Sequence, residues 1–246
     1  MCYNDNMLFF RIFQTYGLCR EALLACIDAG LAIVIALCAH EFSHALVAKW
    51  NGDYTAKVAG RLTLNPKAHF DLFGLFLMLM LGFGYARPVP VNPNNYKNRR
   101  LGEITVSLAG VFTNMLLAAI SSGFAALLTY SSTYYDQGTT PYYIVFFLWM
   151  LFMYTMTVNI SFALFNILPI FPLDGFRFIA AFVGEDNRFM RGLRNASVYI
   201  LLGIVVVDWV CGIVPVLEKY SPLYWYFTRF GGLIQRTFIT MWRLPI

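Results

Sequence analysis

The sequence predicts an all-α polytopic membrane protein, and three observations point to this fold class. The 246 residues are 59% hydrophobic and only 13% charged, whereas about 25% of residues are charged in soluble domains. Several apolar runs reach the roughly 20 residues that a helix needs to cross the hydrocarbon core of a bilayer. Lysine and arginine gather in a few segments between these runs, a pattern typical of membrane-protein loops.

The apolar runs predict the membrane-spanning helices in chain order. We expect helices near residues 22–49, 104–130, 142–166 and 196–216, with a further candidate near 223–243. Each run is long enough to span the bilayer as a helix. Together with one shorter apolar run, they give a total of about five to six transmembrane helices.

The shorter apolar run, residues 72–86, is interrupted by glycine and flanked by basic residues on both sides. A segment whose two ends lie on the same side of the membrane is more simply a re-entrant loop than a span. We therefore predict a re-entrant loop here. A conventional span is the alternative that the sequence leaves open.

A proline-rich segment follows at residues 84–93. Its prolines at 88, 90 and 93 exclude a helix and favour extended backbone. Together with a second short strand over residues 56–64, it would form a small membrane-associated β-sheet. An exposed strand of this kind could pair with an extended peptide segment of another protein. The alternative is an ordinary proline-rich loop.

The distribution of basic residues predicts the orientation in the membrane. Segments 49–71, 87–100 and 175–195 contain 12 of the 18 lysines and arginines. Because basic loops face the cytoplasm, these three segments are expected on that side. The first span then runs from outside to inside. The formal net charge of +5 is explained by this bias, and we expect no nucleic-acid partner.

The chain is expected to form one membrane-embedded domain over residues 1–246, with a catalytic core of about 22–180. No linker or long loop separates a second, soluble domain. The five cysteines contain no C-x-x-C pair, so neither a cysteine zinc site nor a disulfide framework is expected.

Residues 40–44 read His-Glu-Phe-Ser-His inside the first predicted span. Positions i and i+4 of a helix share one face, so His40 and His44 can bind one zinc ion while Glu41 lies beside them as a base. The chain has only three histidines, and ionisable groups are costly at membrane depth. This setting favours a metal site over a packed histidine pair.

A catalytic zinc ion needs a third protein ligand and an open position. Asp174 is the best candidate, because Pro169 and Pro172 break the preceding helix and Gly175 allows a turn. A helix-terminal Asp-Gly turn is the alternative. Asn166 could donate to a developing oxyanion, or it could bridge neighbouring helices. We predict one Zn²⁺ per chain, with Glu41 activating a zinc-bound water.

Five patterns occur in order along residues 30–180. They are His40-Glu41-x-x-His44, Gly60 to Gly74, Gly84 to Pro93, Ala109 to Asn114, and Asn159 to Gly175. In these patterns the chain resembles the site-2 protease family of zinc intramembrane metalloproteases, in a minimal form without a PDZ or CBS domain. One departure is Val111, where the family often has proline.

The resemblance implies that His40, His44 and Asp174 are the zinc ligands and Glu41 is the catalytic acid and base. It also implies that Asn166 assists near the scissile bond.

The predicted function is zinc-dependent intramembrane proteolysis of membrane-protein segments by a metalloendopeptidase. Expected partners are a single-span substrate or its remnant, the lipid bilayer and a regulatory membrane protein. We expect a multi-pass protein of a bacterial cell membrane, with the active site near the cytoplasmic side. A membrane metal-ion transporter and a non-catalytic client-binding protein of the same fold are the alternatives.

Overall fold

The structure is a computed structural model that describes residues 12, 20–71, 74, 87–132, 134–136, 138–184, 186–213 and 217–242. Within these residues, four helices are long and apolar enough to cross a membrane. They are α2 (Arg20–Trp50), α6 (Arg99–Ser132), α7 (Thr140–Asn166) and α9 (Arg188–Ile213). The four correspond to the first four predicted spans, whereas the expected total of five to six is not reached in the described part of the chain.

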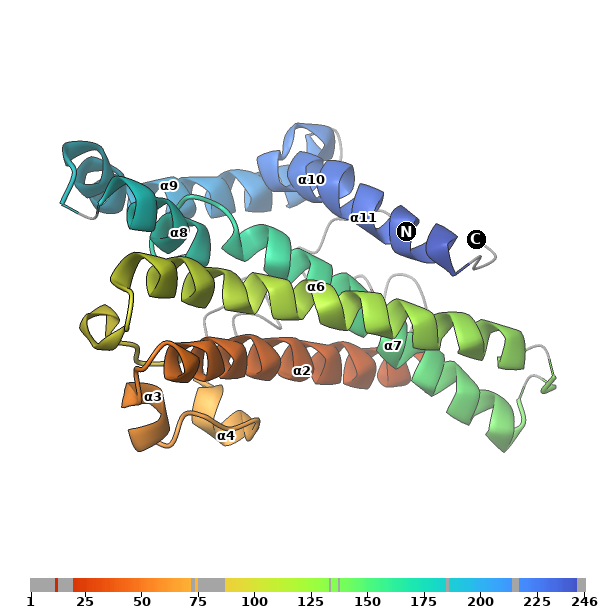
Figure 1. The fold of residues 1–246 in the computed structure, drawn as a ribbon. Helices are drawn as coiled ribbons and strands as arrows, with labels where there is room; N and C mark the ends of the chain where they lie inside the picture. The colour runs from red at the N-terminus through yellow and green to blue at the C-terminus, as the bar shows by residue number, and fades with distance from the viewer. Residues whose placement is uncertain are drawn as a thin grey trace.

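Helices α2, α6 and α7 pack against one another and form the core of the molecule (Figure 1). Half of the buried residues of α2 are alanines. Its buried alanines are Ala22, Ala25, Ala29, Ala32, Ala36, Ala45 and Ala48. Small side chains let helix backbones approach closely, which is how helices associate when lipid removes the hydrophobic driving force.

The basic segment over residues 175–195, for which no helix was predicted, is largely helical. Helix α8 (Asp174–Val183) packs on α6, and α9 begins at Arg188. Phe176 and Ala180 are buried against Met190. A short amphipathic helix has a mixed apolar and basic composition, so hydropathy alone does not separate it from a loop.

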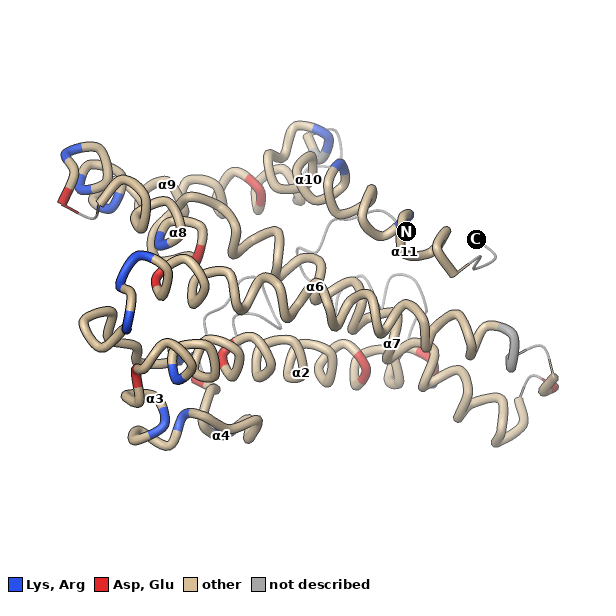
Figure 2. Tube along the Cα trace, in the orientation of Figure 1, with Lys and Arg blue, Asp and Glu red and all other residues tan. Residues whose placement is uncertain are grey.

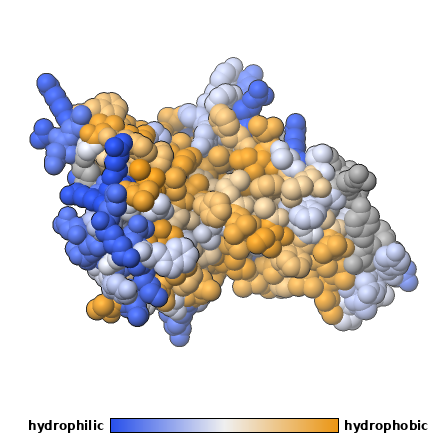
Figure 3. All heavy atoms as spheres, in the orientation of Figure 1, coloured by the Kyte–Doolittle hydropathy of each residue, from blue (hydrophilic) through white to orange (hydrophobic). Residues whose placement is uncertain are grey.

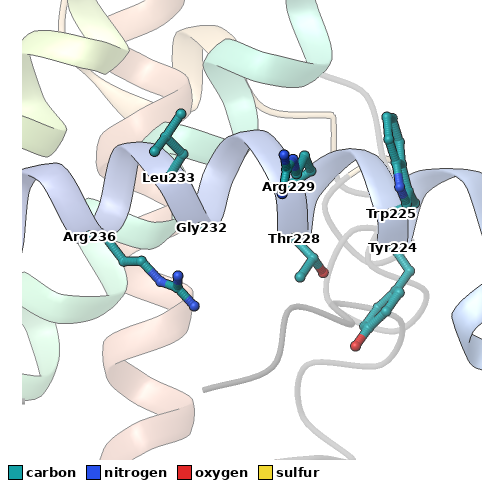
Figure 4. Close-up of a pocket in the computed structure, with 7 residues that line it drawn as sticks. All are labelled: Tyr224, Trp225, Thr228, Arg229, Gly232, Leu233 and Arg236. Carbon is teal, nitrogen blue, oxygen red and sulfur yellow. The ribbon is translucent and has the colours of Figure 1, made fainter.

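The last predicted helix, 223–243, is interrupted. It consists of α10 (Pro222–Tyr226), a π-helical turn η3 (Phe227–Gly231) and α11 (Gly232–Met241), after the short 3₁₀ turn η2 (Glu218–Tyr220). An open pocket on this element (Figure 4) is lined by Tyr224, Trp225, Thr228, Arg229, Gly232, Leu233 and Arg236. The pocket shares no residue with the metal-ligand group described below.

The small β-sheet is absent from the residues that the structure describes. Part of the strand predicted over 56–64 is a helical turn, α3 (Thr55–Val58), and the connection continues through α4 (Pro66–His69) and the 3₁₀ turn η1 (Pro93–Asn95). The Asp53 carboxylate accepts hydrogen bonds from the amide and hydroxyl of Thr55, which favours a turn over a strand. The re-entrant loop predicted over 72–86 lies almost wholly outside the described residues.

Charged and apolar residues occupy different parts of the molecule along the direction of the helix axes. Most lysines and arginines gather at the end of the bundle where α2 ends and α6 and α9 begin (Figure 2). Apolar side chains cover the middle of the face shown in Figure 3, between that polar end and a mixed one. This distribution matches the basic end that the sequence places on the cytoplasmic side.

Asp53 ties the turn after α2 to the extended segment before η1. Its side chain is buried, and its carboxylate accepts the Asn92 amide at 2.7 Å and Asn95 Nδ2 at 2.8 Å, besides the two Thr55 groups. Burial alone would raise the pKa of Asp53, but the hydrogen bonds from Thr55, Asn92 and Asn95 outweigh burial and lower it.

Replacing Asp53 by asparagine is expected to destabilise the protein by about 1–3 kcal/mol, because one or more donors lose a charged acceptor. Since the folded-state pKa is lowered, this stabilisation is complete above the ordinary pKa and disappears as the pH falls through the folded-state value. The midpoint of thermal unfolding of Asp53→Asn should therefore approach that of wild type in acid. Asp136→Asn, which changes an exposed carboxylate, is the control. A difference that grows in acid would contradict the prediction.

Candidate metal centre

Three buried side chains from two helices meet in the interior of the bundle. His40 and His44 lie one turn apart on α2, and Asp174 is the first residue of α8. His40 Nε2 lies 3.1 Å from His44 Nε2 and 3.1 Å from Asp174 Oδ2, and His44 Nε2 lies 3.2 Å from the same oxygen. All three residues are at most 7% exposed. These are the three metal ligands predicted from the sequence.

The hydrogen bonds of the two imidazoles fix which ring nitrogens face the centre. His44 Nδ1 lies 2.7 Å from the Val106 carbonyl oxygen, which can only accept, so this nitrogen carries the proton. His40 Nδ1 lies 2.6 Å from Asn114 Oδ1. The amide of Asn114 is oriented by its nitrogen, which donates to the Ala36 carbonyl. Both Nε2 atoms of the neutral rings therefore point bare lone pairs at each other.

This arrangement fits a cation. Two lone pairs and a carboxylate oxygen repel one another unless a positive charge lies between them, and Asp174 Oδ2 is buried without a hydrogen bond of acceptable geometry. A tetrahedral zinc ion with ligands at about 2.0–2.1 Å separates its ligand atoms by about 3.3–3.4 Å. The observed separations of 3.1–3.2 Å are close to that value.

Two buried asparagine side chains form a hydrogen-bonded chain that begins at Nδ1 of His40. Asn114 on α6 accepts from His40 and donates to Asn159 Oδ1 on α7 at 2.7 Å, and Asn159 donates to the Thr155 carbonyl at 2.8 Å. Both asparagines are completely buried. Helices α2, α6 and α7 thereby meet in one hydrogen-bonded network that orients a candidate ligand.

Two glycines allow α2 and α8, the helices that carry the candidate ligands, to pack closely against neighbouring parts of the chain. A Cβ atom on Gly110 of α6 would lie 2.3 Å from the His40 ring, and one on Gly175 of α8 would lie 2.1 Å from the Ile167 carbonyl oxygen. Gly175 was expected to allow a turn, but it lies in the first turn of α8 and serves close approach instead.

Glu41 is held by a backbone amide from the proline-rich segment. Its Oε2 accepts the Val89 N–H at 2.9 Å. Pro88 and Pro90 have no N–H, and the carbonyl oxygens of Arg87 and Pro88 are hydrogen-bonded by Arg61. These contacts occupy the Val89 N–H and the carbonyl oxygens of Arg87 and Pro88, so these three groups are not available for the strand pairing that the sequence suggested.

Asn166 is not brought onto the three-residue group. It is the last residue of α7, and its amide nitrogen donates to the Phe162 carbonyl of the same helix at 3.0 Å. His69, the third histidine, lies 2.7 Å from the Thr63 carbonyl through Nε2 and is fully buried.

Comparison with known proteins identifies the family. The sequence profile of Peptidase family M50 matches residues 29–207. The chain belongs to this family. The predicted resemblance to the site-2 proteases is thereby confirmed, and the long apolar helices make this M50 member a multi-pass membrane protein.

The chain is similar in sequence to proteins from Bacillus subtilis and Mycolicibacterium smegmatis. YwhC from Bacillus subtilis (strain 168) is 40% identical over 159 residues, which is 64% of this chain and 70% of the relative. Rip2 from Mycolicibacterium smegmatis is 28% identical over 205 residues, covering 80% and 72%. Both carry provisional names as zinc metalloproteases. No solved structure matches this M50 chain.

Asn114 and Asn159 had no role predicted from the sequence, although both lie within the patterns that carry the resemblance to the site-2 proteases. The available signal was an amide side chain within an apolar span, where polar groups need partners. Which group each one meets depends on how three helices pack, and local sequence does not contain that information.

Replacing Asn114 by alanine is expected to weaken zinc binding by about 10–100-fold, because His40 Nδ1 loses its acceptor and the ring its orientation. Competition with a metal-chelating dye measures the affinity. Ser121→Ala, two helical turns further along α6 and also buried, is the control. Equal zinc affinity of the two variants would contradict this role.

Proposed function

We propose that this M50 protein is an intramembrane zinc endopeptidase that hydrolyses peptide bonds within or near transmembrane segments of membrane proteins. The observation that carries the proposal is the convergence of His40 Nε2, His44 Nε2 and Asp174 Oδ2 in the buried interior. Glu41 lies directly beside His40 on α2. Water chemistry would then take place inside the helix bundle.

In this proposal His40, His44 and Asp174 hold one zinc ion. Bound zinc supplies a Lewis acid that favours ionisation of water near neutral pH and polarises the scissile carbonyl. Glu41 takes the proton of the attacking water and delivers it to the leaving amine nitrogen, so its carboxylate is regenerated in each cycle.

Asn166 is proposed to hold the carbonyl of the substrate. One N–H of its amide is used by the Phe162 carbonyl, and the second N–H donates to none of the residues that the structure describes, so it could bind a substrate oxygen. Asn166 lies at the end of α7 and is half-buried, so its amide is partly accessible.

The proposed location is a bacterial cell membrane, with the active site near the cytoplasmic side. His40 lies ten residues before Trp50, the last residue of α2, which corresponds to about 15 Å along the helix. That end carries most of the basic residues. Water could reach the site without crossing the whole bilayer. The proposed substrate is a single-span protein or its remnant, and a regulatory membrane protein could present it.

The proposal is tested with the full chain, purified and reconstituted with a model span that contains helix-destabilising residues. We expect one zinc per chain, cleavage of the span, loss of cleavage after zinc is removed by a chelator, and recovery after zinc is added back. Zinc-loaded protein that transports metal into vesicles and cleaves no such span would instead support a metal transporter and overturn the proposal.

A further inference from the structure

Arg61 lies beside the glutamate of the metal site without belonging to the metal-ligand group. It directly follows Gly60, which has a positive φ of 69° and lies just after α3. The backbone N–H of Arg61 donates to the Ala56 carbonyl at 2.8 Å. Its Nη2 atom donates to the carbonyl oxygen of Arg87 and, at 3.3 Å, to that of Pro88. One guanidinium thus binds two successive carbonyls of the proline-rich segment.

The segment that Arg61 holds meets Glu41 at the next residue. Pro88 and Pro90 have no N–H, so Val89 supplies the one backbone donor among these three residues. That N–H donates to Glu41 Oε2 at 2.9 Å. The two carbonyls bound by Arg61 come directly before the amide that binds the glutamate.

Packing fixes the position of Val89 from its other side. Its side chain is 6% exposed and contacts Ala45 of α2 and Ala56 of α3, with Leu62 packed against the same cluster. Ala45 lies four residues after Glu41, so both face the same side of α2. The amide of Val89 is therefore fixed by its side chain and by the neighbouring carbonyls.

We propose that Arg61 is a positioning residue for the peptidase reaction and acts on Glu41 through Val89. By holding the two carbonyls, it keeps the Val89 N–H aimed at Glu41 Oε2. Glu41 Oε1 accepts no hydrogen bond from the described residues, so it is free to accept the proton of water. This inference rests on the proposed function for its effect on rate.

The first test compares the rates of Arg61→Ala, Arg61→Lys and Lys67→Ala in the full chain. A misplacement of about 1 Å can cost about 100-fold in rate, so we expect kcat of Arg61→Ala to fall about 10–100-fold, with KM and zinc content unchanged. Arg61→Lys should recover part of the rate, because an ammonium can bind one of the two carbonyls. Lys67→Ala, an exposed neighbour, should match wild type.

The second test does not depend on activity. Hydrogen exchange of the Val89 amide, measured by mass spectrometry or NMR, should accelerate in Arg61→Ala and in Glu41→Ala and remain slow in Lys67→Ala. Unchanged exchange in Arg61→Ala, or a rate loss that is matched by loss of zinc, would overturn the positioning role. If the wild-type protein binds zinc and cleaves nothing, the proposed function fails, while the exchange experiment still tests the contact.

Discussion

Glu41→Gln is expected to bind one zinc ion per chain and to lose about 10²–10⁴-fold in kcat, the contribution typical of a positioned acid and base. Glutamine has nearly the same shape, and its amide oxygen can still accept the Val89 N–H that Glu41 Oε2 accepts. It cannot take up a proton from water near neutral pH. The substitution therefore separates proton transfer from the geometry of the site.

The measurement is cleavage of a helix-destabilised span at saturating substrate, alongside zinc content by elemental analysis. Glu103→Gln is a suitable control, because Glu103 forms an i,i+4 ion pair with Arg99 near the start of α6. We expect its activity to equal that of wild type. A fully active Glu41→Gln protein would contradict the assigned role.

Asp174→Asn is expected to weaken zinc binding strongly, because the substitution replaces a metal ligand. Loss of a residue that only hydrogen-bonds a ligand costs roughly 10–100-fold in metal affinity, and we expect a larger loss here. A carboxylate supplies negative charge to the ion, whereas the amide oxygen is neutral. Activity should be lost in proportion to bound zinc. High zinc concentrations should restore it in part.

Zinc affinity and activity are to be titrated together for this variant. Asp186→Asn, an exposed residue in the turn between α8 and α9, is the matched control and should resemble wild type. If Asp174→Asn bound zinc with unchanged affinity, the third ligand would have to be another group.

The long helices could be predicted because each contains a continuous apolar run of the length needed to cross a bilayer, and such a run is visible in the local sequence. The predicted span 22–49 matches α2 (Arg20–Trp50) within two residues at its start, and 142–166 matches α7 at its end. The fourth span was placed at 196–216, but α9 begins at Arg188. Its first turns are basic and carry no hydropathy signal.

The short elements were harder to predict. The strand expected over 56–64 depended on pairing with the proline-rich segment, and the Asp53 hydrogen bonds favour a helical turn there instead. Helix α8 was missed because ten residues give too weak a periodic pattern. In both places the outcome depends on contacts with residues distant in the sequence.

The apolar spans and the His40-Glu41-x-x-His44 motif can be recognised without a structure, because both are patterns within a single helix. Asp174 was inferred from broken helix geometry, but the folded chain was needed to show that Asp174 Oδ2 lies about as near to both Nε2 atoms as they lie to each other. The packing of α6 likewise decided that Asn114 supports His40. These contacts join residues 74 to 134 positions apart, and such distances are fixed by how helices pack and not by local pattern.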